Sequence, residues 1–208
     1  MIFKDRKDAG QKLAQKLLEY RGEPDTWVLG LPRGGVVVAA EVAKVLHLPL
    51  DIIMTRKIGA PHNPELAIGA VDEKGDAIYN EELLVDLGVS SAYQKEEAAK
   101  EQKEAEHRLE LYRKNRPPLD LKNTTVILVD DGLATGATMR AAVYSAKAKK
   151  AKKIIVAVPI AAQSSLAPLK EEADGIIYCE APDSFGAVSS FYELFDQTTD
   201  EEVIQLLS

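Results

Sequence analysis

The feature that most constrains this 208-residue chain is a run of branched apolar residues that ends on two adjacent acids. Residues 126–129 read Val-Ile-Leu-Val and are followed directly by Asp130 and Asp131. A short apolar run of this kind is typical of a strand that is buried on both faces, as in a parallel sheet. Buried strands rarely end on paired acids without a function, so the sequence predicts a site at the carboxyl end of this strand.

The residues after the two acids predict an anion site. Small and hydroxyl-bearing residues alternate from Gly132 to Thr138, and an apolar helical pattern begins after them. Backbone N–H groups and threonine hydroxyls can converge on a phosphate at such a helix N-terminus. The two carboxylates can accept hydrogen bonds from two ribose hydroxyls, so the whole stretch is suited to a sugar phosphate. The loop after the acids would then take the phosphate on C5 of that sugar.

A second glycine-rich turn follows the first predicted strand, residues 26–31. Arg33, Gly34 and Gly35 stand between that strand and a helical pattern at residues 36–46. Two glycines permit a close approach of the backbone to a ligand, and the arginine supplies a cation beside it. Alone, this turn fits a tight structural turn as well as a ligand site. Beside the first motif, we interpret it as a second anion site.

A basic pair, Arg56 and Lys57, follows the next predicted strand, residues 50–55. Basic residues at the carboxyl edge of a parallel strand point toward the crevice in which open α/β sheets bind ligands, although a solvated pair is the simpler alternative. Residues 58–65 contain two prolines, a glycine and no apolar period, which predicts a loop. The titratable residues of this loop are His62 and Glu65, and a loop histidine is commonly only solvated.

Strands and helices alternate through most of the chain, which predicts an α/β fold with a doubly wound parallel sheet. Residues 5–21 form an amphipathic helix to which we assign no chemistry, and residues 66–71 and 76–79 are expected to form a hairpin with its turn at 73–75. The charged stretch 92–114 predicts a long helix, either mostly solvated or serving as a dimer or partner helix.

The C-terminal segment departs from this alternation. Four of the chain's twelve Phe, Tyr and Trp residues fall between positions 185 and 195, and Thr199 with Glu202 predicts a capping box for a final helix. The aromatic residues fit two roles equally well. They could stack on a ligand, or they could form a hydrophobic staple for the final helix.

Composition bounds the class of protein. The length, with 46% hydrophobic and 28% charged residues, suits one domain over residues 1–208. The N-terminus lacks the apolar run of a signal peptide, and no stretch approaches the roughly 20 apolar residues that span a bilayer, so we expect a cytoplasmic protein without membrane contact. The net charge of −7 does not favour general electrostatic binding to nucleic acid. A single cysteine, Cys179, excludes an intrachain disulfide and is expected to be a buried structural thiol.

The stretch 126–139 resembles the phosphoribosyl pyrophosphate (PRPP) motif of the type I phosphoribosyltransferases, and residues 31–35 are similar to the pyrophosphate loop of that family. The resemblance extends to a subgroup of predicted phosphoribosyltransferases whose acceptor is unassigned, and it covers almost the whole chain. The stretches that carry it are Leu-Pro-Arg-Gly-Gly, Arg-Lys-Ile-Gly-Ala-Pro, Glu-Leu-Ala-Ile-Gly-Ala-Val, the PRPP motif and Ser-Phe-Gly-Ala-Val.

This resemblance implies an enzyme that transfers the phosphoribosyl group of Mg²⁺-PRPP to a nucleobase or related nitrogen acceptor and releases pyrophosphate. It implies a type I, Rossmann-like fold with an insertion helix at about 90–116 and a small hood at about 181–208 that covers the base. Residues 58–65 would be the family's flexible catalytic loop. Family habit suggests a homodimer, and Mg²⁺ would be held mainly through PRPP, with no dedicated protein ligand.

By the same resemblance, the residues divide into three roles. The expected catalytic residues are Asp130, Asp131, Arg56, Lys57 and Glu65. The expected pyrophosphate contacts are Arg33, Gly34 and Gly35, and the expected 5-phosphate contacts are the five residues from Ala134 to Thr138.

Two rival functions are weighed against this one. A regulator that binds PRPP or a nucleotide as a sensor, without turnover, would keep the same site, but the acidic composition disfavours RNA as its partner. A P-loop nucleotide hydrolase is excluded, because its turn ends in Gly-Lys-Ser/Thr and the corresponding turn here, Thr135-Gly136-Ala137-Thr138, contains no lysine. One departure is informative. Ala134 stands where hypoxanthine-guanine enzymes have an aspartate, which weighs against 6-oxopurine salvage.

Overall fold

A five-stranded parallel sheet forms the centre of the molecule. The computed structural model describes residues 1–71, 77–113, 116–117 and 119–208. The strand order is β2-β1-β6-β7-β8, and every pairing in this sheet is parallel, as expected from the alternation of strands and helices. Its strands are β1 (Thr26–Gly30), β2 (Leu50–Ile52), β6 (Thr125–Val129), β7 (Lys153–Ile160) and β8 (Gly175–Glu180).

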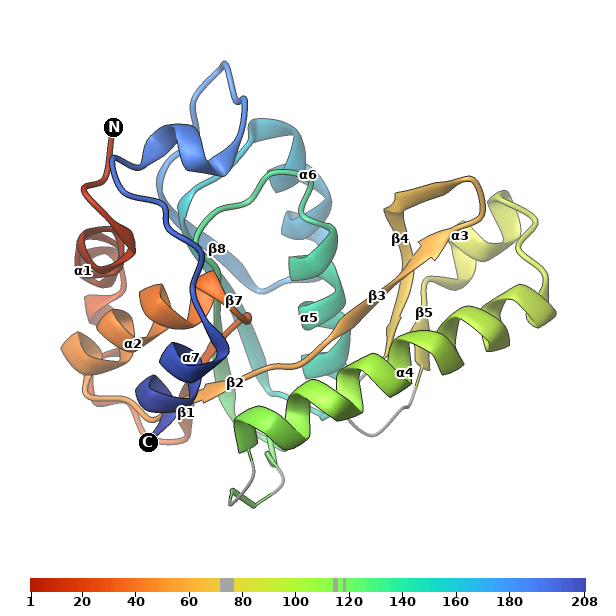
Figure 1. Cartoon of the computed structure of the whole chain (residues 1–208), viewed down its shortest axis with the longest axis horizontal. Helices are drawn as coiled ribbons and strands as arrows, with labels where there is room; N and C mark the ends of the chain where they lie inside the picture. The colour runs from red at the N-terminus through yellow and green to blue at the C-terminus, as the bar shows by residue number, and fades with distance from the viewer. Residues whose placement is uncertain (72–76, 114–115, 118) are drawn as a thin grey trace.

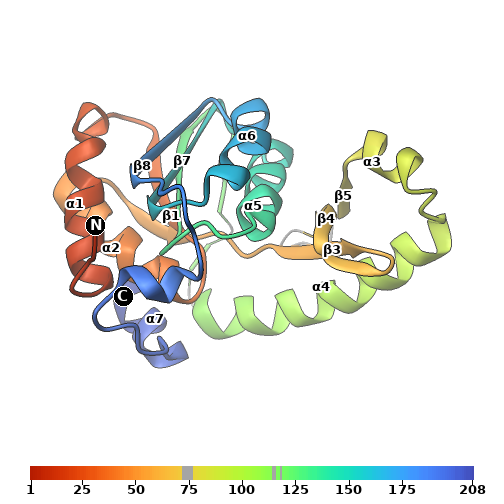
Figure 2. The same ribbon diagram turned by 90° about the horizontal axis from the view of Figure 1, so that it is seen from above.

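Helices cover both faces of this sheet (Figures 1 and 2). On one face, α1 and α2 pack on Ile127 and Val129 of β6, and on the other face α5 and α6 pack on Val126 and Leu128. Alternate residues of a strand point to opposite faces, so the apolar run is buried on both sides as predicted. The helices are α1 (Arg6–Lys16), followed by the 3-10 helix η1 (Leu18–Tyr20), α2 (Gly34–Leu46), α5 (Ala137–Ala148) and α6 (Gln163–Glu172).

A second, antiparallel sheet with the order β3-β4-β5 lies beside the main body, with α3 and α4 packed on it (Figure 1). It has a core of its own, formed by Ile58, Ile68, Val71, Leu84 and Val89 together with Ala60. We call this unit the side module. Its elements are β3 (Arg56–Ala60), β4 (Asn63–Val71), β5 (Ala77–Tyr79), α3 (Glu81–Asp86) and α4 (Ser91–Arg113).

The side module corrects one expectation and confirms another. Residues 58–65 are not a loop, because β3 and β4 pair as a hairpin across a turn at Pro61 and His62. The expected hairpin between residues 66–71 and 76–79 is present as β4 and β5, while its turn at 73–75 lies outside the described residues.

Helix α4 connects the side module to the main body, as Figure 2 shows. It corresponds to the long charged helix expected at 92–114. At its C-terminal end, Tyr112 packs with Val36 and Val203, and the guanidinium of Arg113 donates to Asp51 Oδ2 over 3.1 Å. This end is therefore buried rather than solvated. No helix among the described residues is long and apolar enough to cross a membrane.

The C-terminal segment carries the 3-10 helix η2 (Val188–Phe191) and α7 (Asp200–Leu207), which begins at the expected capping box of Thr199 and Glu202. Phe3, from the N-terminal segment, forms an isolated parallel bridge with Tyr192. From here on, the word hood means residues 181–199 together with the short N-terminal segment at residues 3–4, because backbone hydrogen bonds join the two. Helix α7, which belonged to the hood expected at about 181–208, is not part of it.

Candidate functional site

The two adjacent acids lie where β6 leaves the main sheet. Asp130 and Asp131 follow Val129, the last residue of that strand, and the Asp131 N–H donates to Asp130 Oδ1 over 2.9 Å. Burial raises the pKa of the Asp130 carboxyl well above its usual range, and the negative charge of Asp131 raises it further. Burial also raises the pKa of Asp131. The sheet therefore holds two carboxyl groups side by side at a site where burial disfavours their ionised form.

Two residues distant in sequence hold Asp131 in place. Arg6, in the first turn of α1, donates from Nε to Asp131 Oδ2 over 2.7 Å and opposes the rise in the pKa of that carboxyl. The Tyr192 hydroxyl donates to the Asp131 backbone carbonyl over 2.5 Å, and burial raises the pKa of this phenol. No chemistry was predicted for α1 from the sequence, and neither residue was among the candidate site residues.

A cavity of about 150 Å³ lies beside the acids, over the start of α5. Gly136 is the N-cap of this helix with a φ of 77°, a left-handed conformation that suits glycine, and no side chain caps the helix. The Ala137 N–H has a long contact of 3.4 Å with Thr135 Oγ1. The cavity is lined by Asp130, Gly132, Leu133, Ala134, Thr135, Gly136, Ala137, Thr138, Met139 and Val188.

The second glycine-rich turn packs directly against the acids. A Cβ on Gly35 would lie 2.7 Å from Asp130 Oδ1, and a Cβ on Gly34 would collide with Asp131 Oδ2. Real Cβ atoms do not approach so closely, so only glycine permits this arrangement at either position. Arg33 Nη1 lies 3.7 Å from Asp200 Oδ1 of α7. The structure thus brings together the two motifs that the sequence singled out separately.

The basic pair and the two candidates from the expected loop lie on the side module instead. Arg56 and Lys57 begin β3, rather than ending a parallel strand, and Arg56 Nε donates to Glu101 Oε2 of α4 over 2.7 Å. His62 is exposed in the turn of the β3–β4 hairpin. Glu65 belongs to β4, and its side chain lies outside the described residues.

The hood packs against Ile160 of β7 and Cys179 of β8, beside the acids. A Cβ on Gly132 would lie 2.5 Å from Val188 Cγ1, so the hood touches the loop directly after the acids. The hood aromatics, with Phe185 and Phe191 at a centroid distance of 5.2 Å, belong to a cluster around Phe3. Helix α7 packs in a different cluster, through Val203 and Leu207. This separation disfavours the interpretation of the aromatics as a staple for the final helix.

No group of three or more His, Cys, Asp or Glu side chains among the described residues is arranged to hold a metal ion. One carboxylate of the acid pair is already engaged by Arg6. This donor set fits a cation that reaches the site on the oxygens of a ligand and takes few ligands from the protein, as Mg²⁺ commonly does.

Comparisons with known proteins point to one family. The model of the phosphoribosyl transferase domain family matches residues 2–196. A Mycobacterium tuberculosis H37Rv protein named "putative phosphoribosyl transferase" is 41% identical over 206 residues, which are 99% of this chain and 46% of that protein, and its counterpart in strain CDC 1551 matches equally. This chain therefore spans about half the length of these curated relatives.

A solved structure of similar size also matches. The crystal structure of TT1426 from Thermus thermophilus is 42% identical, with a TM-score of 0.93 over 100% of this chain and 98% of that chain. Its arrangement of a parallel sheet and covering helices is thus the one described above. On the family model, the relatives and the fold together, the chain belongs to the phosphoribosyl transferase domain family.

Proposed function

We propose that the protein is a phosphoribosyltransferase that transfers the 5-phosphoribosyl group of PRPP to a nucleobase or related nitrogen acceptor and releases pyrophosphate. One observation carries the proposal. Asp130 lines the cavity over the N-terminus of α5 and at the same time lies against Gly35 of the second glycine-rich turn. PRPP carries a phosphate at C5 of its ribose and a pyrophosphate at C1. Its site therefore needs one anion site for the phosphate, acids for the ribose between them, and a second anion site for the pyrophosphate.

The charges of the site support a specific placement of PRPP. The N–H groups and the positive dipole end of α5 suit the 5-phosphate, within the cavity lined by residues 134–138. The carboxylates of Asp130 and Asp131 would accept hydrogen bonds from the ribose hydroxyls. The backbone of Gly34 and Gly35, with the Arg33 cation, would receive the pyrophosphate.

We extend the proposal to Arg56 and Lys57 of β3 as further cations for the pyrophosphate. For Arg56 this role requires that its ion pair with Glu101 be exchanged for one with the ligand. The proposed role of Glu65 as a base follows only from the family resemblance.

The reaction needs charge stabilisation more than covalent help from the protein. The lone pair of the acceptor nitrogen forms a bond to ribose C1, and the C1–O bond breaks with its electrons leaving on pyrophosphate. The proton of the acceptor nitrogen would pass to a base, for which the family resemblance offers Glu65, or to solvent. Positive charge develops at the ribosyl carbon and negative charge on the leaving group. The two acids favour the first and Arg33 favours the second. Mg²⁺, where bound, would neutralise pyrophosphate oxygens.

The class of acceptor is narrowed by one position in the cavity. Ala134 offers no carboxylate to a purine N7 proton, so we propose that hypoxanthine and guanine are not the acceptors. Adenine and orotate enzymes also lack an aspartate at this position, so a screen of bases should begin with these two and measure release of pyrophosphate.

The test of the proposal is calorimetric titration with PRPP and Mg²⁺. The wild-type protein is expected to bind with micromolar affinity, and Asp130→Asn/Asp131→Asn is expected to lose this binding. The matched control is Asp86→Asn/Asp120→Asn, which removes two exposed carboxylates that the proposal does not place at the site and should bind as the wild type does. A folded wild-type protein that does not bind PRPP would contradict the proposal.

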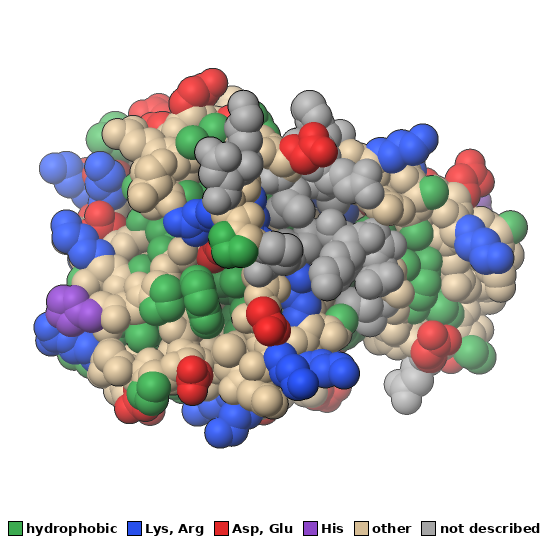
Figure 3. Space-filling view, turned by 90° about the horizontal axis from the view of Figure 1, so that it is seen from below, with side chains coloured by type: hydrophobic (Ala, Val, Ile, Leu, Met, Phe, Trp, Pro, Cys, Tyr) green, Lys and Arg blue, Asp and Glu red, His purple; other side chains and the backbone are tan. Residues whose placement is uncertain are grey.

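The same preparation separates an enzyme from a sensor. PRPP binding with no pyrophosphate release from any acceptor tested would favour the sensing role. The net charge of −7 disfavours an RNA-binding regulator. On the face seen in Figure 3, Lys and Arg side chains are interspersed with Asp and Glu. Salt-dependent retention of RNA is therefore expected to be absent.

A further inference from the structure

Arg6 contacts the acid pair, the second glycine-rich turn and the hood at once. Its Nε donates to Asp131 Oδ2 over 2.7 Å, and its Nη1 donates to the Asp196 carbonyl over 2.7 Å. The guanidinium lies 3.8 Å from the centroid of the Phe195 ring. A Cβ on Gly34 would lie 2.7 Å from Nε and 3.0 Å from Nη2. The side chain of Arg6 is only 12% exposed.

We propose that Arg6 is a positioning residue of the ribose site, which fixes the carboxylate of Asp131 and ties it to the hood. The inference rests on the proposed function, because it assigns Asp131 to the ribose hydroxyls. Arg6 acts through Asp131, so it differs from residues that touch the substrate.

The placement of the cation is unfavourable for the helix that carries it. Arg6 and Lys7 occupy the first turn of α1, where the helix dipole favours acidic residues. Asp8 is the acid of that turn, and the helix gains no dipole benefit from an arginine at position 6. The planar guanidinium instead makes a charged hydrogen bond, a second hydrogen bond and an aromatic contact. This combination suits arginine and is not reproduced by lysine.

The electrostatics explain why the acid pair needs this cation. Burial raises the pKa of both carboxyls, and the charge of Asp131 raises the pKa of Asp130 further. Arg6 is the cation that opposes the rise in the pKa of Asp131. Three side chains face Asp131: Asp130 beside it, Arg6 from α1, and the neutral hydroxyl of Tyr192 from the hood. The turn of Arg33 and Gly34 lies on the remaining side, and Arg33 itself is close to Asp200. Without Arg6, Asp131 would accept a proton more readily and would accept hydrogen bonds from a hydroxyl less well.

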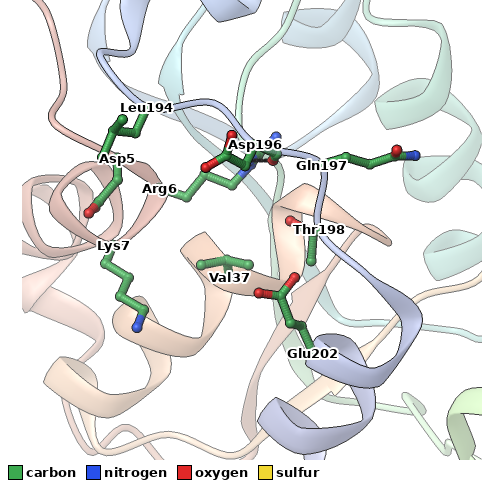
Figure 4. A pocket seen from close by; sticks show the side chains of 9 residues that line it. All are labelled: Asp5, Arg6, Lys7, Val37, Leu194, Asp196, Gln197, Thr198 and Glu202. Atoms are coloured by element: carbon green, nitrogen blue, oxygen red, sulfur yellow. Dashed lines mark hydrogen bonds between the residues drawn. The ribbon is translucent and has the colours of Figure 1, made fainter.

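A cavity of about 250 Å³ on the other side of Arg6 makes the inference testable by substitution. Figure 4 shows Arg6 reaching from α1 toward Asp196 between Val37 and the C-terminal segment. The cavity is open to polar groups such as Lys7 and Glu202, so water can fill the space left by a shorter side chain. Arg6→Gln should therefore fold.

The experiment follows the Asp131 carboxyl carbon by NMR during a pH titration of the ligand-free protein, in wild type, Arg6→Gln, Arg6→Lys and Lys12→Gln. Both carboxyls of the pair are recorded, because adjacent acids share their titration. Lys12→Gln is the matched control: it removes a cation of the same helix, which pairs with Asp8. Arg6→Gln is expected to raise the titration midpoint of Asp131 by about 1–2 pH units, Arg6→Lys by less, and the control not at all.

Affinity for Mg²⁺-PRPP is then measured across the pH range on both sides of neutrality with the same variants. Binding should weaken as pH falls through the midpoint of Asp131, so the acid limb of the profile should move to higher pH in Arg6→Gln and be partly restored in Arg6→Lys. Arg6→Gln should also bind about tenfold more weakly at neutral pH.

The outcomes distinguish this inference from the proposed function. An unchanged midpoint in Arg6→Gln, or an equal loss of affinity at every pH, would overturn the positioning role while leaving the phosphoribosyltransferase proposal in place. A wild-type protein that binds no PRPP would instead overturn the proposed function itself, and the assignment of Asp131 to ribose with it. Circular dichroism and thermal denaturation confirm that each variant is folded.

Discussion

Gly35 lies so close to Asp130 that a single methyl group does not fit between them. A Cβ at position 35 would stand 2.7 Å from Asp130 Oδ1 and 2.8 Å from its Cα. The two glycine-rich loops are therefore in contact through the acids, and the geometry of one loop depends on the other.

Gly35→Ala should weaken Mg²⁺-PRPP binding by about tenfold or more, because the added methyl group displaces the turn or the acid. Overpacking of this kind should also lower the free energy of unfolding by about 1–3 kcal/mol. The matched control is Gly88→Ala, whose φ of 61° makes a side chain unfavourable but where a Cβ meets no atom within 4 Å. The control should lose about 1 kcal/mol of stability and no affinity. Equal affinities for the two variants in calorimetry would contradict the prediction.

Asp130→Asn should stabilise the ligand-free protein and abolish PRPP binding. Burial raises the pKa of Asp130 in the folded state above its unfolded value. Between these two values the folded state retains a proton that the unfolded state has released, so the free energy of unfolding falls as pH rises through this window. The amide has no proton to lose. At neutral pH the variant should gain roughly 1 kcal/mol, or about 2–4 °C in Tm. Melting curves from acidic to mildly alkaline pH check the prediction, and a destabilised variant at neutral pH would contradict it.

Tyr192→Phe should reduce stability more than affinity. The phenol hydroxyl donates to the backbone carbonyl of Asp131, and its removal leaves that carbonyl without this donor at a cost of about 1–3 kcal/mol. Because burial keeps the pKa of this phenol above its usual value, the hydrogen bond should persist in mildly alkaline solution. Tyr178→Phe on β8 serves as the control. Denaturant unfolding at neutral and at mildly alkaline pH should give the same loss for Tyr192→Phe, and a loss that disappears in alkaline solution would disprove the assignment.

Arg113→Met should destabilise the attachment of α4 to the main body. The side chains of Arg113 and Asp51, which form an ion pair, are 7% and 4% exposed. Removing the arginine leaves the buried carboxylate of Asp51 without this partner. Arg116 Nη1, at 3.4 Å from the same carboxylate, compensates in part, so we expect a loss of about 3 kcal/mol. Lys12→Met, which breaks the exposed pair with Asp8, should cost less than about 1 kcal/mol. Equal losses in urea unfolding would refute the prediction.

The acid pair and both glycine turns could be predicted because their signals are local. An apolar run, two acids and a turn stand on consecutive residues, and the main sheet positions them without further long-range information. The β3–β4 hairpin was missed because its turn is Pro61-His62 rather than a typical hairpin pair such as Asn-Gly, with His62 at a φ of 66°. The pairing also shifts register on both sides of Gly59, so the hairpin is irregular where a regular alternation of apolar and polar residues would indicate a strand.

Arg6 could not be found from its neighbours in the sequence, since its partner lies 125 residues away. The one local signal was electrostatic. Two cations in the first turn of a helix oppose the helix dipole, which indicates that at least one of them serves a contact outside the helix.

The bridge between Phe3 and Tyr192 also has a consequence for the order of events during folding. The two backbone partners lie far apart in the sequence. Contacts of such high sequence separation form late, because the intervening chain must be closed first. The main sheet and its acid pair are therefore expected to form before the hood docks on them.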